Sequence, residues 1–453
     1  MFISQNAFQN LTSRISSKAA IIRIFLAVLA FSIPAAPGLS GAYQATQVQE
    51  VQEDAVHRLW SSTIEPSLRR QVTENNQAQT MAVTLMVPLH AAFQHRDERW
   101  IQGFAAQFSQ FASDPSALPS GEVAEISRLY YFYLASQFVV LAKSSGRQDL
   151  IPQNLPDLIY SELHSFWLVT PAWQFDQKPF PGAGRERLLW KLKNRRVRKS
   201  YYRAVLDHDL YVFAIAADLK AFEGNADQQE AWSPLLDDIL SITHQVFTQE
   251  VAYQPDGGWV FQPGVWTDHP EYQYAGNQQA VSGIKPAPVR GIAPDSSHSL
   301  RFPLWLTSLM NAYPSGSDER RFYENLRSGL EKQFFNKVLH QPAPDLPCFL
   351  IANFMDGSNG VYRWSYQTLG KENGYGPYQN SASFLLGWWV FLDTERIRTV
   401  YKEVAAQFPW PRQCVELYLR PHPSDVPRSE SAYDPASSEL RTMHICSLLA
   451  ASL

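Results

Sequence analysis

The sequence contains few cysteines, and it lacks the common nucleotide-binding and metal-binding motifs. Its three cysteines, Cys348, Cys414 and Cys446, exclude a disulfide-rich scaffold. An oxidising compartment would allow one bridge among them, leaving one thiol unpaired in the chain. No G-x-S-x-G elbow, Walker loop or dinucleotide fingerprint appears, which disfavours acyl transfer and nucleotide chemistry. No histidine or cysteine spacing suggests zinc, and we expect neither a metal nor a cofactor.

The start of the chain lacks acidic residues. Residues 1–23 carry three basic side chains and no Asp or Glu, and the apolar run Ile24–Ile33 follows. Ser40 and Ala42 then occupy positions −3 and −1 of a cleavage site after Ala42. A ten-residue run would rise only about 15 Å as a helix, too little to span a membrane. We predict a signal peptide over residues 1–42 and an exported protein, periplasmic or secreted, with no transmembrane segment in the mature chain.

Helix-period patterns recur through the body of the chain, whereas strand signals are few, which predicts an all-α fold. We expect a tail and first helix over residues 43–80, a large domain over 81–410 and an extension over 411–453. The expected helices are Met81–Phe93, Trp100–Phe111, Gly121–Lys143, Asp157–Leu168, Arg185–Phe222 with a break near Asn194, Ser233–Val251 opened by its Ser-Pro pair, Ser297–Ala312, Asp318–Val338, Ser381–Leu392 and Thr394–Gln407.

Two long irregular stretches, Tyr253–Ser296 and Gln341–Asn380, interrupt the helical pattern. Both are rich in aromatic residues, in a chain with 13 Trp, 20 Tyr and 26 Phe. Long loops in compact domains are usually functional or disordered, and an aromatic composition argues against disorder. We therefore expect two ordered loops, called here the first and second loop, that line a site.

An exported chain of helical hairpins with Trp- and Tyr-rich loops resembles the α/α toroid proteins, which include six-hairpin glycosidases and several polysaccharide lyases. The resemblance covers about Met81 to Gln407 and concerns architecture and composition. No catalytic signature carries over residue by residue. It implies an aromatic-lined cleft for sugar chains, built by inner helix ends and long loops.

Reactive side chains are densest where the first loop meets the next helix. Asp295 precedes Ser296 or Ser297, either of which is expected to cap that helix, and the helix dipole favours a carboxylate there. His298 and Arg301 are three residues apart and are expected to share a helix face. The simpler interpretation is structural: Asp295 supports the helix start and pairs with Arg301.

Two reactions fit these residues. Glycoside hydrolysis needs two carboxylates, which Asp268 or Glu271 could form with Asp295; Asp356 and Glu372 are further candidates. Elimination from a uronate needs a base such as His298 or Tyr274 and a cation such as Arg301. The candidate catalytic residues are thus Asp295, His298, Arg301, Asp268 and Glu271, and the candidate sugar-binding residues are Trp259, Trp266, Tyr274, Tyr375, Tyr378 and Trp364.

The segment Arg185–Arg203 carries nine basic residues and one acidic residue. It is either a solvated helix face or a contact for an anionic partner, which would favour acidic glycans. Export and a net charge of only −4 argue against nucleic acid. We predict an exported carbohydrate-active protein that cleaves a polysaccharide or oligosaccharide. The alternative is a non-enzymatic envelope protein that binds glycan or a protein partner.

Overall fold

The computed structural model describes residues 54–70, 72, 75–119, 125–176, 179–222, 226–422 and 428–453. These residues are mostly helical, as predicted, while the predicted signal peptide lies outside them. The α-helices after a helical stretch over 54–63 are α2 (Glu65–Leu68), α3 (Asn75–His95), α4 (Glu98–Ser113), α5 (Glu125–Ser144), α6 (Leu155–His164), α7 (Gly184–Lys193), α8 (Asp207–Phe222), α9 (Ala226–Glu250), α10 (Ser296–Ser299), α11 (Phe302–Asn311), α12 (Asp318–Gln333), α13 (Ser381–Phe384), α14 (Glu395–Ala406), α15 (Arg412–Tyr418) and α16 (Ser438–Ser452).

Short helical turns and strands connect these helices. The 3₁₀ turns are η2 (Pro115–Ala117), η4 (Gln148–Leu150), η6 (Ser200–Arg203), η7 (Pro270–Tyr272), η9 (Trp388–Leu392) and η10 (Glu430–Tyr433), and the π-helical turns are η5 (Ser165–Val169) and η8 (Phe334–Val338). Strand β1 (Val251–Tyr253) pairs antiparallel with β2 (Trp259–Phe261), and β3 (Leu339–His340) pairs antiparallel with β4 (Leu350–Ile351).

Several helix boundaries differ from the sequence prediction, and two of these differences have a clear local cause. Helix α9 begins at Ala226, so Pro234 lies inside it, and the predicted start at the Ser-Pro pair is wrong. The buried ring of Trp232 stacks on Tyr160 of α6, and this contact holds the turns before the proline. The predicted helix through Leu392 is also interrupted, because Gly387 adopts a left-handed φ of 85° and a 3₁₀ turn follows.

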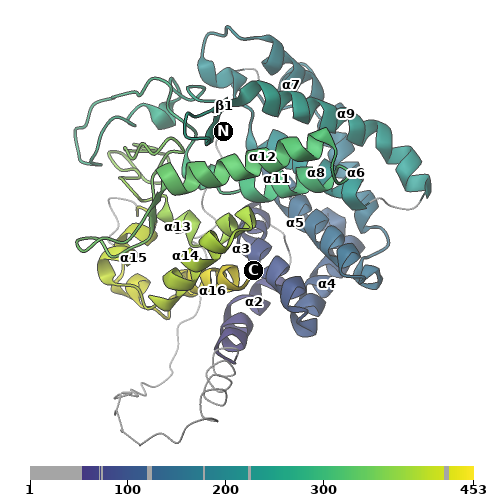
Figure 1. Cartoon of the computed structure of the whole chain (residues 1–453), viewed down its shortest axis with the longest axis horizontal. Helices are drawn as coiled ribbons and strands as arrows, with labels where there is room; N and C mark the ends of the chain where they lie inside the picture. The colour runs from purple at the N-terminus through teal and green to yellow at the C-terminus, as the bar shows by residue number, and fades with distance from the viewer. Residues whose placement is uncertain are drawn as a thin grey trace, which may run out of the picture.

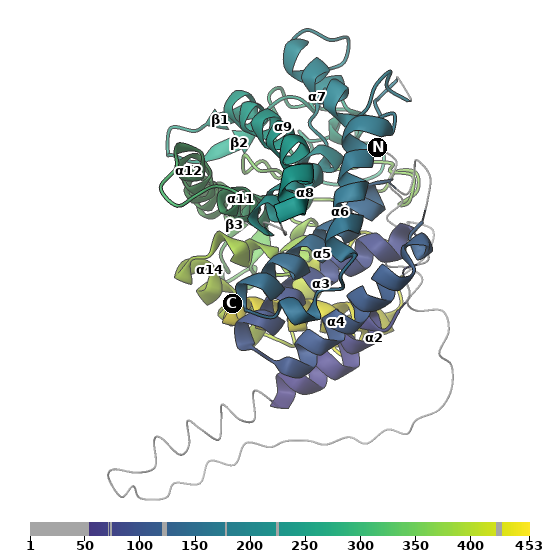
Figure 2. The same cartoon turned by 90° about the vertical axis from the view of Figure 1, so that its right-hand side faces the viewer.

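The helices contact one another in a closed order. Helix α3 packs on α5, α5 on α8 and α8 on α11; α11 contacts η9, η9 contacts α16, and α16 packs back on α3. Figure 1 shows α16 beside α3, and Figure 2 shows α8 beside α11. Helices α3, α5, α8 and α11 each also pack on the next helix in the chain, which makes four helical hairpins. Helix α8 is buried on all sides from His208 to Leu219, as expected of a helix surrounded by others.

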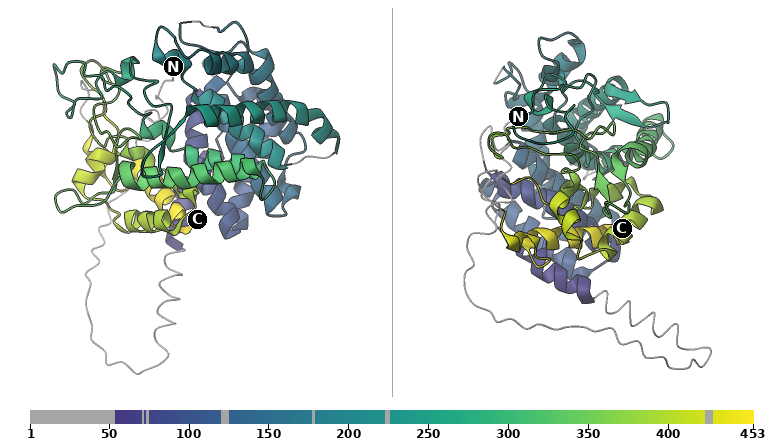
Figure 3. Two further views of the ribbon diagram at one scale, coloured as in Figure 1. Left: turned by 45° about the horizontal axis from the view of Figure 1, so that its top comes forward. Right: turned by 90° about the vertical axis from the view of Figure 1, so that its left-hand side faces the viewer.

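The first and second loops pack on each other. Tyr272, Ala275 and Ile292 of the first loop form one buried cluster with side chains of the second loop, including Tyr362 and Tyr375. Figure 3 shows these loops on one side of the molecule. The aromatic residues of the loops thus build a small core of their own.

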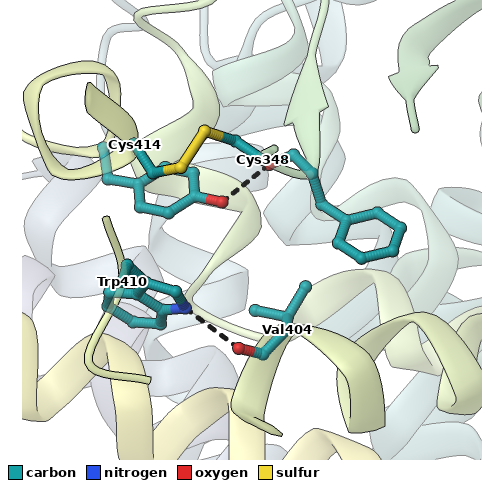
Figure 4. Close-up of a disulfide and its surroundings, with 6 residues drawn as sticks. Cys348, Val404, Trp410 and Cys414 are labelled. Atoms are coloured by element: carbon teal, nitrogen blue, oxygen red, sulfur yellow. Dashed lines mark hydrogen bonds between the residues drawn. A yellow bond between two sulfur atoms is a disulfide. The ribbon is translucent and has the colours of Figure 1, made fainter. Parts of the chain in front are cut away.

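The C-terminal residues 428–453 are part of the same body. Helix α16 buries Leu440, Met443 and Leu449 in the main core. A disulfide joins Cys348, beside β4, to Cys414 of α15, while Cys446 is a buried free thiol. Figure 4 shows this disulfide near Trp410, whose indole donates to the Val404 carbonyl at 2.9 Å. None of the helices in the described residues is long and apolar enough to cross a membrane.

Candidate functional site

A pocket lies where α8 and α11 begin. Its walls come from the first residues of these helices, from β2 and the first loop, and from the second loop. Aromatic rings cover much of the wall, including Trp266, Tyr272 and Tyr362. Its ionisable side chains are Asp207, His269, Glu271, Asp295, His298 and Arg363, together with Tyr272 and Tyr362.

Asp295 and His298 form a hydrogen-bonded pair in this pocket. Asp295 is itself the N-cap of α10, accepting from the His298 backbone N–H at 3.1 Å, so the predicted serine cap is wrong. His298 Nδ1 lies 2.9 Å from both carboxylate oxygens of Asp295. A carboxylate only accepts, so Nδ1 carries the hydrogen, and in the neutral ring Nε2 keeps its lone pair. No residue in the described ranges bonds to Nε2, and 26% of the side chain is exposed.

Asp295 is held in its ionised form. Its Oδ2 accepts from the hydroxyls of Tyr272 and Tyr362 at 3.0 and 3.2 Å, and Ser297 donates to Oδ1 at 2.5 Å. Burial alone would raise the pKa of Asp295, but His298, Arg363 and the Ser297 hydroxyl together lower it well below its usual range. Asp295 therefore orients His298 and stays charged, which suits it to support a base.

Glu271 and Arg363 form the second pair in the pocket. Arg363 Nε lies 2.6 Å from Glu271 Oε2, and the Arg363 backbone N–H donates to the Glu271 carbonyl at 2.9 Å. Burial would raise the pKa of Glu271, yet Arg363 and His269 lower it. Arg363 has a left-handed φ of 55°, a conformation that non-glycine residues rarely adopt. Its terminal nitrogens bond to no described residue, which leaves them able to bind a ligand.

Two predicted catalytic residues, Arg301 and Asp268, do not line the pocket. Arg301 is buried beneath the pocket, where Nη1 donates at 3.1 Å to Asp207 and to the His298 carbonyl, and its guanidinium lies over the Tyr130 ring. It shares no helix with His298, because α10 ends at Ser299 and Arg301 is the N-cap of α11. Asp268 accepts from the backbone N–H of Ser200 at 3.0 Å and fixes η6 instead of facing the pocket.

The remaining carboxylates proposed from the sequence are also absent from the pocket lining. Asp356 accepts from the backbone N–H groups of Ala293 and Ser358 at 3.2 and 2.8 Å, as a turn residue does. Glu372 is exposed and bonds to the Ser282 hydroxyl.

Of the six predicted sugar-binding aromatics, only Trp266 lines the pocket. Trp259 is 1% exposed and donates to the Leu326 carbonyl, so it offers no face to a ligand. Tyr375 is buried in the cluster between the loops, and Trp364 is buried beside the half-exposed Tyr274. Tyr378 packs on His340. These aromatics mostly hold the loops together.

The basic segment is largely neutralised. Arg187 and Lys191 of α7 are buried and both pair with Asp209 of α8. The arginines at 185, 195, 198 and 203 also pair with acidic residues. Exposed cations without an ion pair to a described residue are Lys193, Arg196 and Lys199. The positive charge that the segment offers to an anionic polymer is therefore mainly that of these three side chains.

Sequence reasoning missed Arg363 and Asp207 as pocket residues. Arg363 lies 92 positions from Glu271 in the chain, and no local pattern joins them. The described residues contain no group of three His, Cys, Asp or Glu that could hold a metal ion. No family model, curated protein or solved structure matches the chain. The pocket is therefore interpreted from its own geometry.

Proposed function

We propose that this chain is an exported carbohydrate-active enzyme that cleaves an acidic glycan by elimination in the pocket described above. The observation that carries the proposal is the pairing of a His298 imidazole, oriented by Asp295, with the free guanidinium nitrogens of Arg363 in one pocket. A base and a cation are the two groups that elimination from a uronate requires. Trp266 supplies a partly exposed ring on which a pyranose can stack.

Three features support the toroid and the export that this proposal includes. The closed order of contacts from α3 through α5, α8, α11, η9 and α16 back to α3 is the order that an α/α toroid requires. The pocket lies at the starts of two of these helices, where the cleft of a toroid is expected. Export is supported by the Cys348–Cys414 disulfide, because such bonds persist in oxidising compartments.

Hydrolysis is the competing reaction, and the carboxylate spacing alone would allow it. Glu271 Oε2 and Asp295 Oδ2 each lie 3.2 Å from the Tyr362 hydroxyl, so they are at most about 6.4 Å apart, twice that distance. Hydrolysis also needs one carboxyl group that keeps its proton, and the pKa values of both groups are lowered. The protonation states therefore favour elimination.

The proposed step uses His298 as the base. Nε2 takes the proton from C5 of a uronate, the electron pair of that C–H bond forms a double bond between C4 and C5, and the C4–O glycosidic bond breaks. The leaving oxygen gains a proton, which the His298 imidazolium can return. Arg363, whose terminal nitrogens have no partner among the described residues, donates hydrogen bonds to the substrate carboxylate and so stabilises the negative charge that builds up beside C5.

Incubation of the purified mature protein with neutral and acidic polysaccharides tests the proposal. Polygalacturonate, alginate, hyaluronate and heparan sulfate cover the acidic class, and xylan and galactan serve as neutral controls. New ultraviolet absorbance from an unsaturated uronate, with matching new reducing ends, is the expected result. Reducing ends without that absorbance would establish hydrolysis instead. Binding without cleavage on every polymer would leave the protein a glycan-binding protein and overturn the enzyme proposal.

A further inference from the structure

His269 is a second histidine in the same pocket, and its ring is held rigidly. It is 8% exposed and lines the pocket on the first loop. Four aromatic rings meet it nearly edge to face, with centroid distances between 4.8 and 6.2 Å: Phe175, Tyr201, Trp266 and Tyr272. Such packing leaves the imidazole little rotational freedom.

One ring nitrogen of His269 accepts a hydrogen bond from the backbone. Nδ1 accepts from the backbone N–H of Glu271 at 3.3 Å, where His269 caps η7. A backbone N–H can only donate, so the neutral ring must carry its hydrogen on Nε2. Burial lowers the pKa of His269 to about 4; Glu271 opposes this effect and Arg363 adds to it. The ring is therefore an uncharged donor at neutral pH.

The two pocket histidines thus have opposite hydrogen-bonding polarity. His298 has its hydrogen on Nδ1, facing Asp295, and presents a lone pair at Nε2. His269 accepts at Nδ1 and presents a hydrogen at Nε2. No described residue accepts from His269 Nε2, so that donor is available to a ligand.

We infer that His269 Nε2–H donates to a carboxylate oxygen of the substrate, completing with Arg363 a subsite for the acidic group of a uronate. This inference rests on the proposed function and adds a specificity-determining residue to it. His269 is an uncharged donor here because burial, the largest effect on its pKa, disfavours the charged ring. As the carboxylate takes up charge after C5 loses its proton, a fixed hydrogen bond to its oxygen strengthens.

Two substitutions separate the roles of the two nitrogens. In His269→Asn the amide oxygen can replace Nδ1 as acceptor but nothing donates from the Nε2 position, whereas His269→Gln can place an amide donor near Nε2. On the acidic polymer that the wild type cleaves, we expect His269→Asn to lower kcat by about 10²-fold, as loss of one oxyanion donor does. His269→Gln should recover most of that loss. Equal losses in both variants, or none in either, would overturn the inference.

A second measurement is independent of turnover. Nitrogen-15 histidine labelling reports the tautomer of each ring, with His269→Asn and His298→Asn assigning the signals. We expect the Nε2–H tautomer for His269 and Nδ1–H for His298 at pH 7, and a shift of the His269 signal on adding galacturonate or glucuronate. A cationic or Nδ1–H ring at His269, or no shift with either sugar, would overturn the inference. If the tautomers and the shift are found but no polymer is cleaved, the proposed reaction fails while the carboxylate subsite stands.

Discussion

The Nδ1 atom of His298 lies 2.9 Å from each carboxylate oxygen of Asp295, and Asp295 is at the same time the N-cap of the helix that carries His298. One buried carboxylate thus fixes both the helix start and the ring orientation. The remaining ring nitrogen is free to take a proton from a ligand in the pocket.

Replacing either member of this pair should abolish most activity. We expect His298→Ala to lower kcat/KM by about 10³-fold, the usual contribution of a general base, and Asp295→Asn to lower it by at least about 10²-fold, since an amide can stabilise the wrong tautomer. His164→Ala, at an exposed position of α6, is the matched control. Initial rates on the cleaved polymer measure the effect, and full activity in His298→Ala would exclude it as the base.

The buried Asp218 of α8 should make stability depend on pH. It accepts from Ser136 and Gln137 at 2.6 and 2.7 Å, and Gln137 in turn contacts His90. Burial raises the pKa of Asp218 to about 7, whereas an unfolded Asp titrates near 3.9. The folded state then binds the extra proton, so this contribution to stability is complete below about pH 4 and is lost as pH rises through about 7.

Urea unfolding of wild type and Asp218→Asn between pH 5 and pH 8 measures this contribution. The wild type should lose stability across the range, and the variant should lose clearly less. Asp237→Asn, exposed on α9, should behave as the wild type. Parallel slopes in all three proteins would show that Asp218 keeps an ordinary pKa.

Asp209 should be essential for stability. It forms ion pairs with both Arg187 and Lys191, and all three side chains are at most 2% exposed. Burial lowers the pKa of Lys191 to about 7, so Asp209→Asn chiefly leaves the buried Arg187 without a counter-charge, which should cost about 3–5 kcal/mol of unfolding free energy. Asp176→Asn, which removes the exposed pair with Arg198, should cost less than about 1 kcal/mol. Guanidinium unfolding of both variants provides the comparison, and similar small losses would contradict the role of Asp209.

The disulfide should contribute a large share of stability. Cys348 and Cys414 are 66 residues apart, and in the chain-entropy account a closed loop of this length is worth about 4 kcal/mol. Reduction of the wild type should lower the unfolding free energy by about that amount. The double variant Cys348→Ser, Cys414→Ser should start at the lower value and not respond to reductant. An unchanged wild type under reduction would show that the bond adds nothing.

Gly360 should be needed for the two loops to meet. A Cβ atom there would lie 1.7 Å from the Ala275 carbonyl oxygen of the first loop, so the loops must move apart. Gly360→Ala should reduce activity more than it reduces Tm, because the second loop carries Tyr362 and Arg363 into the pocket. Gly103→Ala in α4, where the nearest atom is a flexible leucine methyl group at 3.1 Å, is the control. Unchanged activity in Gly360→Ala would contradict this account.

The sequence predicts best those features that depend on residues close together in the chain. Glu271 and Asp295 lie in the first loop and His298 follows it directly, and all three side chains line the same pocket. Helix positions were predictable for the same reason, since a 3.6-residue period is a local pattern.

Most differences between the sequence prediction and the structure arise from contacts between residues far apart in the chain. Arg363 reaches the pocket because Gly360 and Tyr362 bring the second loop against the first, which no spacing reveals. The sequence predicts that Trp259 and Tyr375 face sugars, but Trp259 is buried in the main core and Tyr375 in the cluster between the two loops. Helix α9 begins before Pro234 because Trp232, which precedes the proline, stacks on Tyr160 of another helix.

The closed order of helix contacts has a consequence for how the chain folds. The hydroxyl of Ser452 meets His95 across 357 positions of sequence, and Arg441 meets the carbonyl of Ser62 across 379. Each hairpin can form locally, but these last contacts require the two ends of the chain to find each other. Bringing distant segments together costs entropy before any contact rewards it. We therefore expect the docking of α16 to limit the folding rate.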